Sequence, residues 1–308
     1  MRNTFINGLV QQASLNHRIA LIVGDLGYSV VEPFAKKFPE RFINAGVAEQ
    51  NMMGIAAGMA SEGYHVFVYS IANFPTFRCA EQIRNDVAYH NLPVTVVTVG
   101  GGLSYGNLGY SHHALQDYAL VRVMPNMLIA APGDPIEVSA CLGYLCRNPQ
   151  PSYFRIGKSG EPNLHEGEID ISPGFWLKVG TGQSRGTTKK AILTTGTTLA
   201  LARSILKQAG KIDDYDLFSM PLWSMADKKN QAIQVKNYQE VITLEDHLVD
   251  GGFGSWMLES IAQYGPDLVD RIKIRGLADN VCGRVGSQDE LNAFGGLTQE
   301  GIFQSSVY

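Results

Sequence analysis

The segment Phe42-Ile-Asn-Ala-Gly-Val-Ala-Glu49 brings one carboxylate to the start of a predicted helix, where it could take part in acid-base chemistry. From Ala48 to Ala60 the residues are apolar or small nearly all round, which predicts a helix buried on every side. Burial favours a protonated carboxyl at the mouth of such a helix, whereas the helix N-terminus favours the anion. Held between these influences, Glu49 could share a proton with a ligand. Considered alone, an ordinary first-turn acidic residue is the commoner interpretation.

Two histidines and an aspartate follow predicted strands, where the functional residues of parallel sheets collect. His112 and His113 lie in a glycine-rich loop after the strand 94–99, and Asp25 ends the strand 19–23. A neutral imidazole can hydrogen-bond a carbonyl or hydroxyl and transfer a proton near pH 7. The alternatives are structural histidines and a turn aspartate.

Alternating elements must position these residues. Short β-rich runs at 19–23, 65–69, 93–99, 127–131 and 152–156 alternate with helical spacing such as 79–90 and 135–146. After residues rich in Gly, Pro, Ser and Thr, the alternation resumes with strands at 191–195, 240–244 and 271–274 and helices at 199–208 and 254–263. This pattern predicts an α/β fold of two doubly wound domains with helices on both faces of parallel sheets. The expected domains are 1–160 and 189–308, with a surface linker at 161–188.

Composition excludes several classes of function. A net charge of -4 without a Lys/Arg cluster argues against nucleic acid or an anionic membrane as partner. No apolar run approaches the length of a membrane span, so a cytoplasmic protein is expected. The four cysteines form no C-x-x-C pair, no His/Cys/carboxylate group has zinc spacing, and no P-loop is present. No metal ligands are therefore predicted in this chain.

A series of motifs, which occur in the family's order and near its spacing, resembles the transketolase family of thiamine-diphosphate enzymes. The series is Gly46-Val-Ala-Glu49-Gln-Asn-Met, Phe74-Pro-Thr-Phe77-Arg, Glu81-Gln-Ile-Arg-Asn, Asn91-Leu-Pro-Val94, Ser111-His112-His113-Ala, Pro125-Asn-Met127, Ala131-Pro132-Gly-Asp134, Val241-Ile-Thr-Leu-Glu245-Asp-His247 and Gly251-Gly-Phe-Gly254. The resemblance covers the chain essentially from end to end. It implies the pyrimidine-binding domain followed by the transketolase C-terminal domain, as in the second subunit of split transketolases.

The resemblance implies a role for each matched residue near the cofactor. Glu49 matches the glutamate that exchanges a proton with the aminopyrimidine of thiamine diphosphate and so activates the thiazolium carbon. The protein supplies position and protonation state, and the cofactor supplies the carbon chemistry. Phe74 and Phe77 match the aromatic pair beside the pyrimidine, where either ring could stack, and Asp25 matches a position near the mouth of the site.

On the substrate side, His112 matches the family's substrate-site histidine, and His113 adjoins it. Arg155 and Lys158 fall in the segment where family members bind a substrate phosphate, a task that suits cations. A surface pair of cations is an equally weighted alternative.

Two departures affect the predicted substrate. Gly100 stands where the family has a histidine, and Leu108 stands where it has an aspartate, four residues before His112. Those family residues contact sugar hydroxyls, and leucine cannot accept a hydrogen bond. The pocket around Gly100 and Leu108 is therefore predicted to be less polar and roomier, which favours a deoxygenated or otherwise modified sugar, or a small acyl donor.

The family's Gly-Asp-Gly motif with a downstream Asn, which binds the diphosphate and its divalent metal, is missing. The oxygen ligands for Mg²⁺ or Ca²⁺ are therefore expected on a separate partner subunit, around a homodimeric core in an α2β2 complex. The prediction is a subunit that transfers a two-carbon ketol unit from a ketose-like donor to an aldehyde. The alternatives are the beta subunit of a 2-oxo acid dehydrogenase or related acyl-transferring enzyme, and a non-catalytic scaffold subunit.

Overall fold

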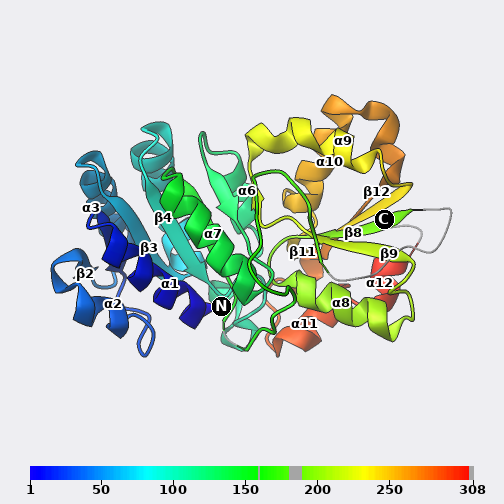
Figure 1. Ribbon diagram of the computed structural model, residues 1–308. Coiled ribbons are helices and arrows are strands. Elements are labelled where there is room, and N and C mark those ends of the chain that lie inside the picture. The colour runs from blue at the N-terminus through cyan, green and yellow to red at the C-terminus, as the bar shows by residue number, and fades with distance from the viewer. Residues whose placement is uncertain (159, 180–188, 305–308) are drawn as a thin grey trace.

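Two sheets lie side by side in the computed structural model, which describes residues 1–158, 160–179 and 189–304 (Figure 1). The strands are β1 (Ile19–Val23), β2 (Phe42–Asn44), β3 (His65–Ile71), β4 (Val94–Val99), β5 (Leu128–Ala130), β6 (Ser152–Ile156), β7 (Leu177–Lys178), β8 (Lys190–Thr194), β9 (Tyr215–Ser219), β10 (Leu222–Trp223), β11 (Glu240–Leu248) and β12 (Ile272–Leu277). The helices are α1 (Arg2–Leu15), α2 (Glu32–Lys37), α3 (Glu49–Ser61), α4 (Asn73–Phe77), α5 (Ala80–Gln82), α6 (Asp117–Arg122), α7 (Pro135–Arg147), α8 (Thr198–Gln208), α9 (Gln231–Val235), α10 (Phe253–Tyr264), α11 (Gln288–Phe294) and α12 (Gln299–Phe303).

The first sheet has seven strands in the order β10-β5-β6-β4-β3-β1-β2, and the second has five in the order β12-β11-β8-β9-β7. Most pairs are parallel, because the chain returns through a helix between neighbouring strands. The predicted α/β class is therefore confirmed. Two short edge strands are antiparallel, β10 against β5 and β7 against β9, which the sequence pattern did not predict.

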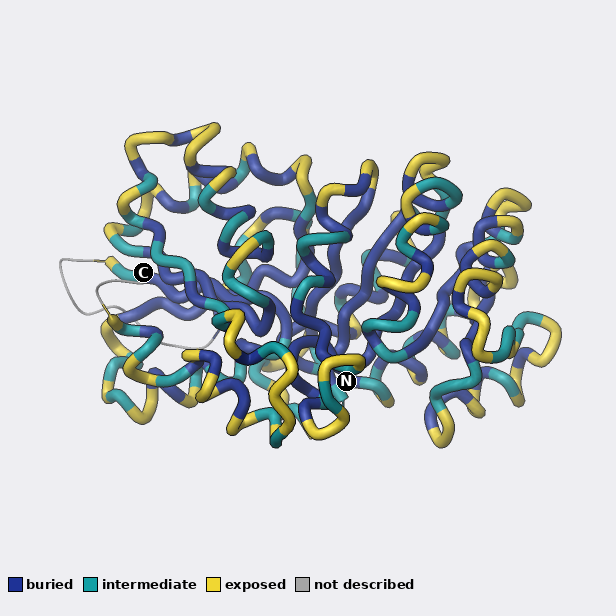
Figure 2. Tube along the Cα trace, turned by 180° about the vertical axis from the view of Figure 1, so that it is seen from behind, coloured by how far each residue is buried: buried dark blue, intermediate teal, exposed yellow. Residues whose placement is uncertain are grey.

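Helices cover both faces of the first sheet. Helices α1, α2 and α7 pack on one face through residues such as Phe5, Phe34 and Leu142, while α3 and α6 pack on the other through Met52 and Tyr118. The central strands β1, β4 and β6 are buried throughout, which explains why their sequences are mainly apolar, β-branched and aromatic (Figure 2).

The second sheet has α8, α11 and α12 on one face and α9 and α10 on the other. The apolar core under α10 is continuous with the core under α3 and α6. Trp223 of β10 joins them, with its ring 5.4 Å from Tyr118 and 5.3 Å from Trp256. Within the described residues, no helix combines the length and apolarity needed to cross a membrane.

Helix α3 departs from its prediction, because it is not buried on every side of this chain. Met52, Met53, Ala56 and Ala60 are buried against the sheet. Gln50, Asn51, Gly54, Gly58 and Ser61 are exposed. The small and polar residues recur at helical spacing and form one face that no element among the described residues covers. The helix is apolar on one side and open on the other.

The predicted linker is more ordered than a simple surface strap. Leu177 and Lys178 form β7, and the indole of Trp176 donates to Gln231 of α9 over 3.0 Å. Residues 180–188 of the predicted linker lie outside the described residues. The predicted helix 79–90 is also different, because α5 passes into a π-helical segment, Ile83–Tyr89.

Candidate functional site

Glu49 begins α3 directly after the turn that follows β2, and its residue is 4% exposed. Gly24, directly after β1, lies beside this side chain, since a Cβ there would be in ordinary contact with Glu49 Cγ at 3.7 Å. The guanidinium of Arg78 donates from Nη1 to Oε1 of Glu49 over 2.7 Å. Because the Arg78 side chain is 49% exposed, this ion pair is partly screened by water. A buried carboxylate thus stands at an open edge of the molecule.

The aromatic pair lies in α4, the short helix after β3. The guanidinium carbon of Arg78 lies 4.2 Å from the centre of the Phe74 ring, so Arg78 bridges Phe74 and Glu49. Phe74 is half-buried, whereas Phe77 is 39% exposed. The exposed ring offers an apolar face to a ligand or to another chain.

Asp25 lies at the mouth of the site, one residue after Gly24. Its φ of 55° is a left-handed conformation that aspartate tolerates better than most residues. Its carboxylate accepts from Asn44 Nδ2 and from the Tyr28 hydroxyl, each over 3.0 Å. These two bonds lower the pKa of Asp25, which keeps it ionised.

His112 lies against the aromatic pair. Its ring meets Phe74 edge to face with centroids 5.2 Å apart, and Asn73 of α4 holds the loop by donating to the carbonyls of Ser111 and His113. Burial, His113 and Arg78 lower the pKa of His112, so its imidazole is neutral near pH 7.

His113 has a different environment. The residue is 1% exposed, and its Nε2 lies 3.3 Å from the carbonyl of Gly106 inside the same loop. The prediction that His113 contacts substrate is wrong, because its ring points into the protein. Its role is to hold the loop that carries His112.

The predicted role of Arg155 is also corrected. Its guanidinium is buried, donates to Asp117 of α6 and Asp246 of β11, and lies 4.4 Å from the centre of the Tyr118 ring. Although burial opposes its charge, the two carboxylates hold its pKa well above the usual value. With its donors engaged, Arg155 cannot be the predicted phosphate ligand; it ties the two sheets together.

Lys158 remains available, and Arg2 joins it. The Arg2 amide donates to the Lys158 carbonyl over 3.2 Å. Burial and the nearby Arg2 lower the pKa of Lys158. Neither cation has a carboxylate partner among the described residues. Two adjacent cations without a carboxylate partner are suited to binding an anion.

The loop around Gly100 is filled rather than roomy. The Tyr105 ring packs against Gly100 so closely that a Cβ there would overlap it, and Gly101 is closed in the same way by Arg155. The prediction of a roomier pocket at Gly100 is therefore wrong. Leu108, 51% exposed, lies at the surface of this loop.

Contacts link these groups in one row. Arg78 joins Glu49 to Phe74, Phe74 meets His112, and the Tyr105 ring lies 6.4 Å from His112. Lys158 Nζ lies 4.3 Å from the centre of the Tyr105 ring. The sequence interpretation missed Arg2, Arg78 and Tyr105. Arg78 directly follows Phe77 in a matched motif, which was a usable signal, but nothing local marked Arg2 or Tyr105.

One cluster among the described residues has the geometry of a metal site: Asp134, Glu137 and His165. Asp134 accepts from the amides of Glu137, Leu164 and His165. Glu137 accepts from the Gly133 amide and the Ser219 hydroxyl, and pairs with His165 over 2.8 Å. Because these oxygens are already occupied by protein donors, the cluster fits a clamp between α7, residues 164–165 and β9 better than a cation site.

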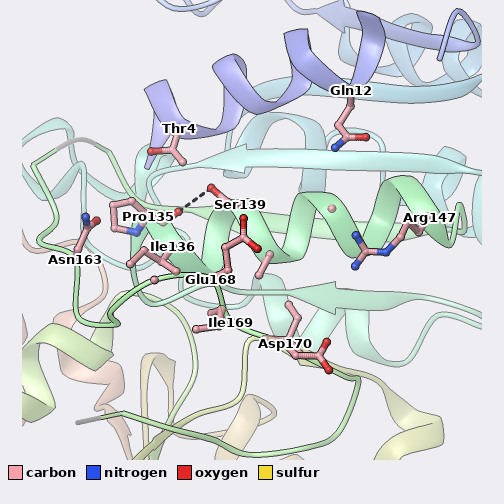
Figure 3. A pocket seen from close by; sticks show the side chains of 14 residues that line it. Thr4, Gln12, Pro135, Ile136, Ser139, Arg147, Asn163, Glu168, Ile169 and Asp170 are labelled. Carbon is pink, nitrogen blue, oxygen red and sulfur yellow. Dashed lines mark hydrogen bonds between the residues drawn. The ribbon is translucent and has the colours of Figure 1, made fainter. Parts of the chain in front are cut away.

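A groove of about 660 Å³ lies away from this row, between α1, α7 and residues 163–171 (Figure 3). Its labelled lining includes Gln12, Arg147, Glu168 and Asp170, and none of the site residues above. Size alone does not identify the chemistry here, so we assign the site to the row from Glu49 to Lys158.

Comparisons with known proteins identify the family to which the chain belongs. The family described as "Transketolase, pyrimidine binding domain" matches residues 1–162. A transketolase C-terminal section of Methanocaldococcus jannaschii is 33% identical, over 98% of this chain and 93% of that protein. One subunit of the apulose-4-phosphate transketolase of Actinobacillus succinogenes is 28% identical, over 92% of this chain and 89% of that protein.

A solved structure described as a split gene transketolase, inactive beta4 tetramer, superposes with a TM-score of 0.81 at 29% identity. It is matched over 98% of this chain and 94% of that one. The sequence and structural matches each extend over nearly the whole chain, as the motif series does. The chain therefore belongs to the transketolase family, as an enzyme subunit composed of the pyrimidine-binding and C-terminal domains.

Proposed function

We propose that this chain is the half of a thiamine-diphosphate-dependent transketolase that contains Glu49 and His112, and that it transfers a two-carbon ketol unit from a ketose to an aldehyde. The observation that supports this most strongly is the row of contacts from Glu49 through Phe74 and His112 to Lys158. This row joins a proton-exchanging group, an aromatic wall, a neutral imidazole and a cation.

The residues near Glu49 fit the pyrimidine of the cofactor. A carboxylate 4% exposed at a helix mouth can hold a proton against a ring nitrogen, and half-buried Phe74 and exposed Phe77 supply an apolar wall. Asp25 shapes the mouth beside Gly24. Thiamine diphosphate, when bound, supplies the nucleophilic carbon that takes up the two-carbon fragment. Arg78 then exchanges its bond to Glu49 for contacts with the ligand or the partner.

His112 serves the substrate. Its lowered pKa leaves the imidazole neutral, so it can accept a hydrogen bond or a proton from a sugar hydroxyl next to the reacting carbonyl. The contact with Phe74 fixes the plane of the ring, and the Asn73 bonds fix the loop.

The substrate is a phosphorylated sugar that lacks or modifies a hydroxyl. Arg2 and Lys158 bind its anionic end, since neither has a carboxylate partner among the described residues. The residues Leu108 and Gly100 themselves provide no side-chain acceptor for a sugar hydroxyl. The relative from Actinobacillus succinogenes, which is named for apulose 4-phosphate, supports a modified sugar phosphate.

The diphosphate and its Mg²⁺ or Ca²⁺ are held mainly by a separate subunit, in an α2β2 complex around a dimer of this chain. The exposed face of α3 and the exposed Phe77 support burial of this region by another chain. We assign the domains to 1–160 and 189–308 with a linker at 161–188, and the enzyme to the cytoplasm.

Reconstitution tests the function. The chain is purified with the subunit that carries the Gly-Asp-Gly motif, and ketol transfer from ketose phosphates is followed with and without thiamine diphosphate. We expect cofactor-dependent turnover only with both chains present. Absence of transfer from every ketose phosphate tested, with both chains and cofactor saturating, would contradict the proposal.

A further inference from the structure

Tyr105 lies in the middle of the row of contacts, between His112 and the cation Lys158. Its ring centroid is 6.4 Å from that of His112, and Lys158 Nζ is 4.3 Å from the ring centre. Burial raises the pKa of its phenol, which is therefore neutral at pH 7. A substrate that reaches from His112 to the cations must pass this residue.

The ring is fixed from behind by the glycine run. A Cβ at Gly100 would overlap the ring, and Gly100 itself has a φ of 79°, which glycine adopts without strain. Behind the same run, Arg155 packs on Gly101 and Asp246 packs on Gly102. The ring therefore rests on a filled surface and cannot retreat toward the sheet when a ligand binds.

We propose that Tyr105 is a specificity-determining residue, whose ring forms the wall along which the carbon chain of a sugar phosphate lies between His112 and the Arg2–Lys158 pair. This inference rests on the proposed function. An aromatic wall favours a sugar that presents C–H bonds toward it, since a hydroxyl pressed against it loses its hydrogen bonds to water. Tyr105 thereby discriminates between sugars that differ in configuration at a carbon in mid-chain.

Kinetics of the reconstituted enzyme with two acceptors that are epimers at the mid-chain carbon C3, D-ribose 5-phosphate and D-xylose 5-phosphate, test the wall. We expect the wild type to prefer one epimer by about 10-fold or more in kcat/KM, the scale of an unpaired hydroxyl. Tyr105→Ala should bring this ratio close to 1 and raise KM for the preferred epimer, with little change in kcat. Tyr105→Phe should retain the discrimination, because it keeps the ring.

Tyr110→Ala is the matched control, since Tyr110 lies in the same loop and is 52% exposed. It should leave the ratio unchanged. Tyr105→Leu replaces Tyr105→Ala if the smaller side chain prevents folding, which thermal melting of each variant will show. The proposal is overturned if the wild type does not discriminate, if Tyr105→Ala discriminates as the wild type does, or if Tyr110→Ala has an equal effect.

The two proposals can fail separately. If the wild type catalyses ketol transfer and Tyr105→Ala has the same selectivity, the proposed role of Tyr105 is overturned. The proposed function of the chain then still stands. If no transfer is observed, calorimetric titration of the assembled complexes with D-ribose 5-phosphate still tests the wall. We expect Tyr105→Ala to bind about 10-fold more weakly than the wild type, and equal affinity overturns the proposal.

Discussion

At the scale of single residues, Glu49 combines burial with a partner that can be exchanged. Its ion pair with Arg78 is partly exposed, so the pair itself adds little to stability. A ligand that replaces Arg78 would therefore displace a weak contact. A buried carboxylate with such a weakly held partner fits the proton exchange that we propose for Glu49.

Glu49→Gln keeps the shape of the side chain but cannot exchange a proton. We expect turnover of the reconstituted enzyme to fall by about 10²-fold or more, the usual scale of lost acid-base assistance, with folding hardly changed. Arg78→Met is the matched control, because it removes the ion pair and leaves the carboxylate, and its loss should be smaller. Near-normal turnover of Glu49→Gln with partner and cofactor saturating would refute the assigned role.

Leu108→Asp tests the polarity of the substrate loop. The introduced carboxylate should shift kcat/KM toward D-ribose 5-phosphate over 2-deoxy-D-ribose 5-phosphate, by about 5- to 150-fold, the equivalent of one satisfied hydroxyl. Stability should change little, because Leu108 is 51% exposed. Asn107→Asp adds the same charge one residue earlier and should not shift the ratio. The opposite result would be a wild type that already prefers ribose 5-phosphate and a Leu108→Asp variant that loses this preference. That result would show that another residue supplies the polar contact to the sugar hydroxyl.

At the scale of elements, Glu245 of β11 connects a strand to a helix. Its carboxyl accepts from the amides of Phe253 and Gly254 at the start of α10, each over 2.7 Å. Burial outweighs these bonds and raises the pKa of Glu245 to about 8. A carboxyl with a raised pKa binds a proton more tightly in the folded chain than in the unfolded chain.

This linkage predicts a pH dependence of stability. Between the ordinary pKa of 4.5 and about 8, the folded chain keeps a proton that the unfolded chain releases, so stability falls as pH rises. From pH 5.5 to 8 the Glu245 contribution to the loss is about 2–3 kcal/mol. Glu245→Gln should lack it, so thermal unfolding at several pH values should show a flatter profile than the wild type. Parallel profiles would rule out the raised pKa.

Sequence patterns were most informative about elements that are buried throughout. The runs 19–23 and 152–156 coincide with β1 and β6, because a strand covered on both faces carries mainly apolar, β-branched and aromatic residues. The edge strands β7 and β10 were missed, since two residues carry no periodicity. The family followed from motifs, and these motifs also singled out Phe74 and His112, whose rings meet in the structure. The burial of Arg155 did not, because its partner Asp246 lies far along the chain in the other sheet.

At the scale of the whole molecule, the two sheets are joined by more than the linker. Arg155 contacts acids from both halves, β10 crosses to the first sheet, and the Trp223 cluster fills the junction. These contacts hold the second sheet against the loop 100–113, which carries His112. The exposed face of α3 and the exposed Phe77 remain available for contact with other chains.

Assembly can be measured directly. We expect light scattering to show an oligomer of this chain alone and a larger complex with the partner subunit. Calorimetry with thiamine diphosphate and Mg²⁺ should show weak binding to this chain and much tighter binding to the complex, since we propose that the partner carries the diphosphate ligands. A stable monomer, or tight metal-dependent binding without the partner, would contradict the proposed arrangement.

The packing of Tyr105 on Gly100 also constrains how such a loop could have evolved. While the ring is in place, a side chain at position 100 has no room, and without glycine there the ring cannot settle. A histidine at position 100 would therefore require a smaller residue at position 105. The two positions are coupled, so a substitution at one limits which residues the other can accept.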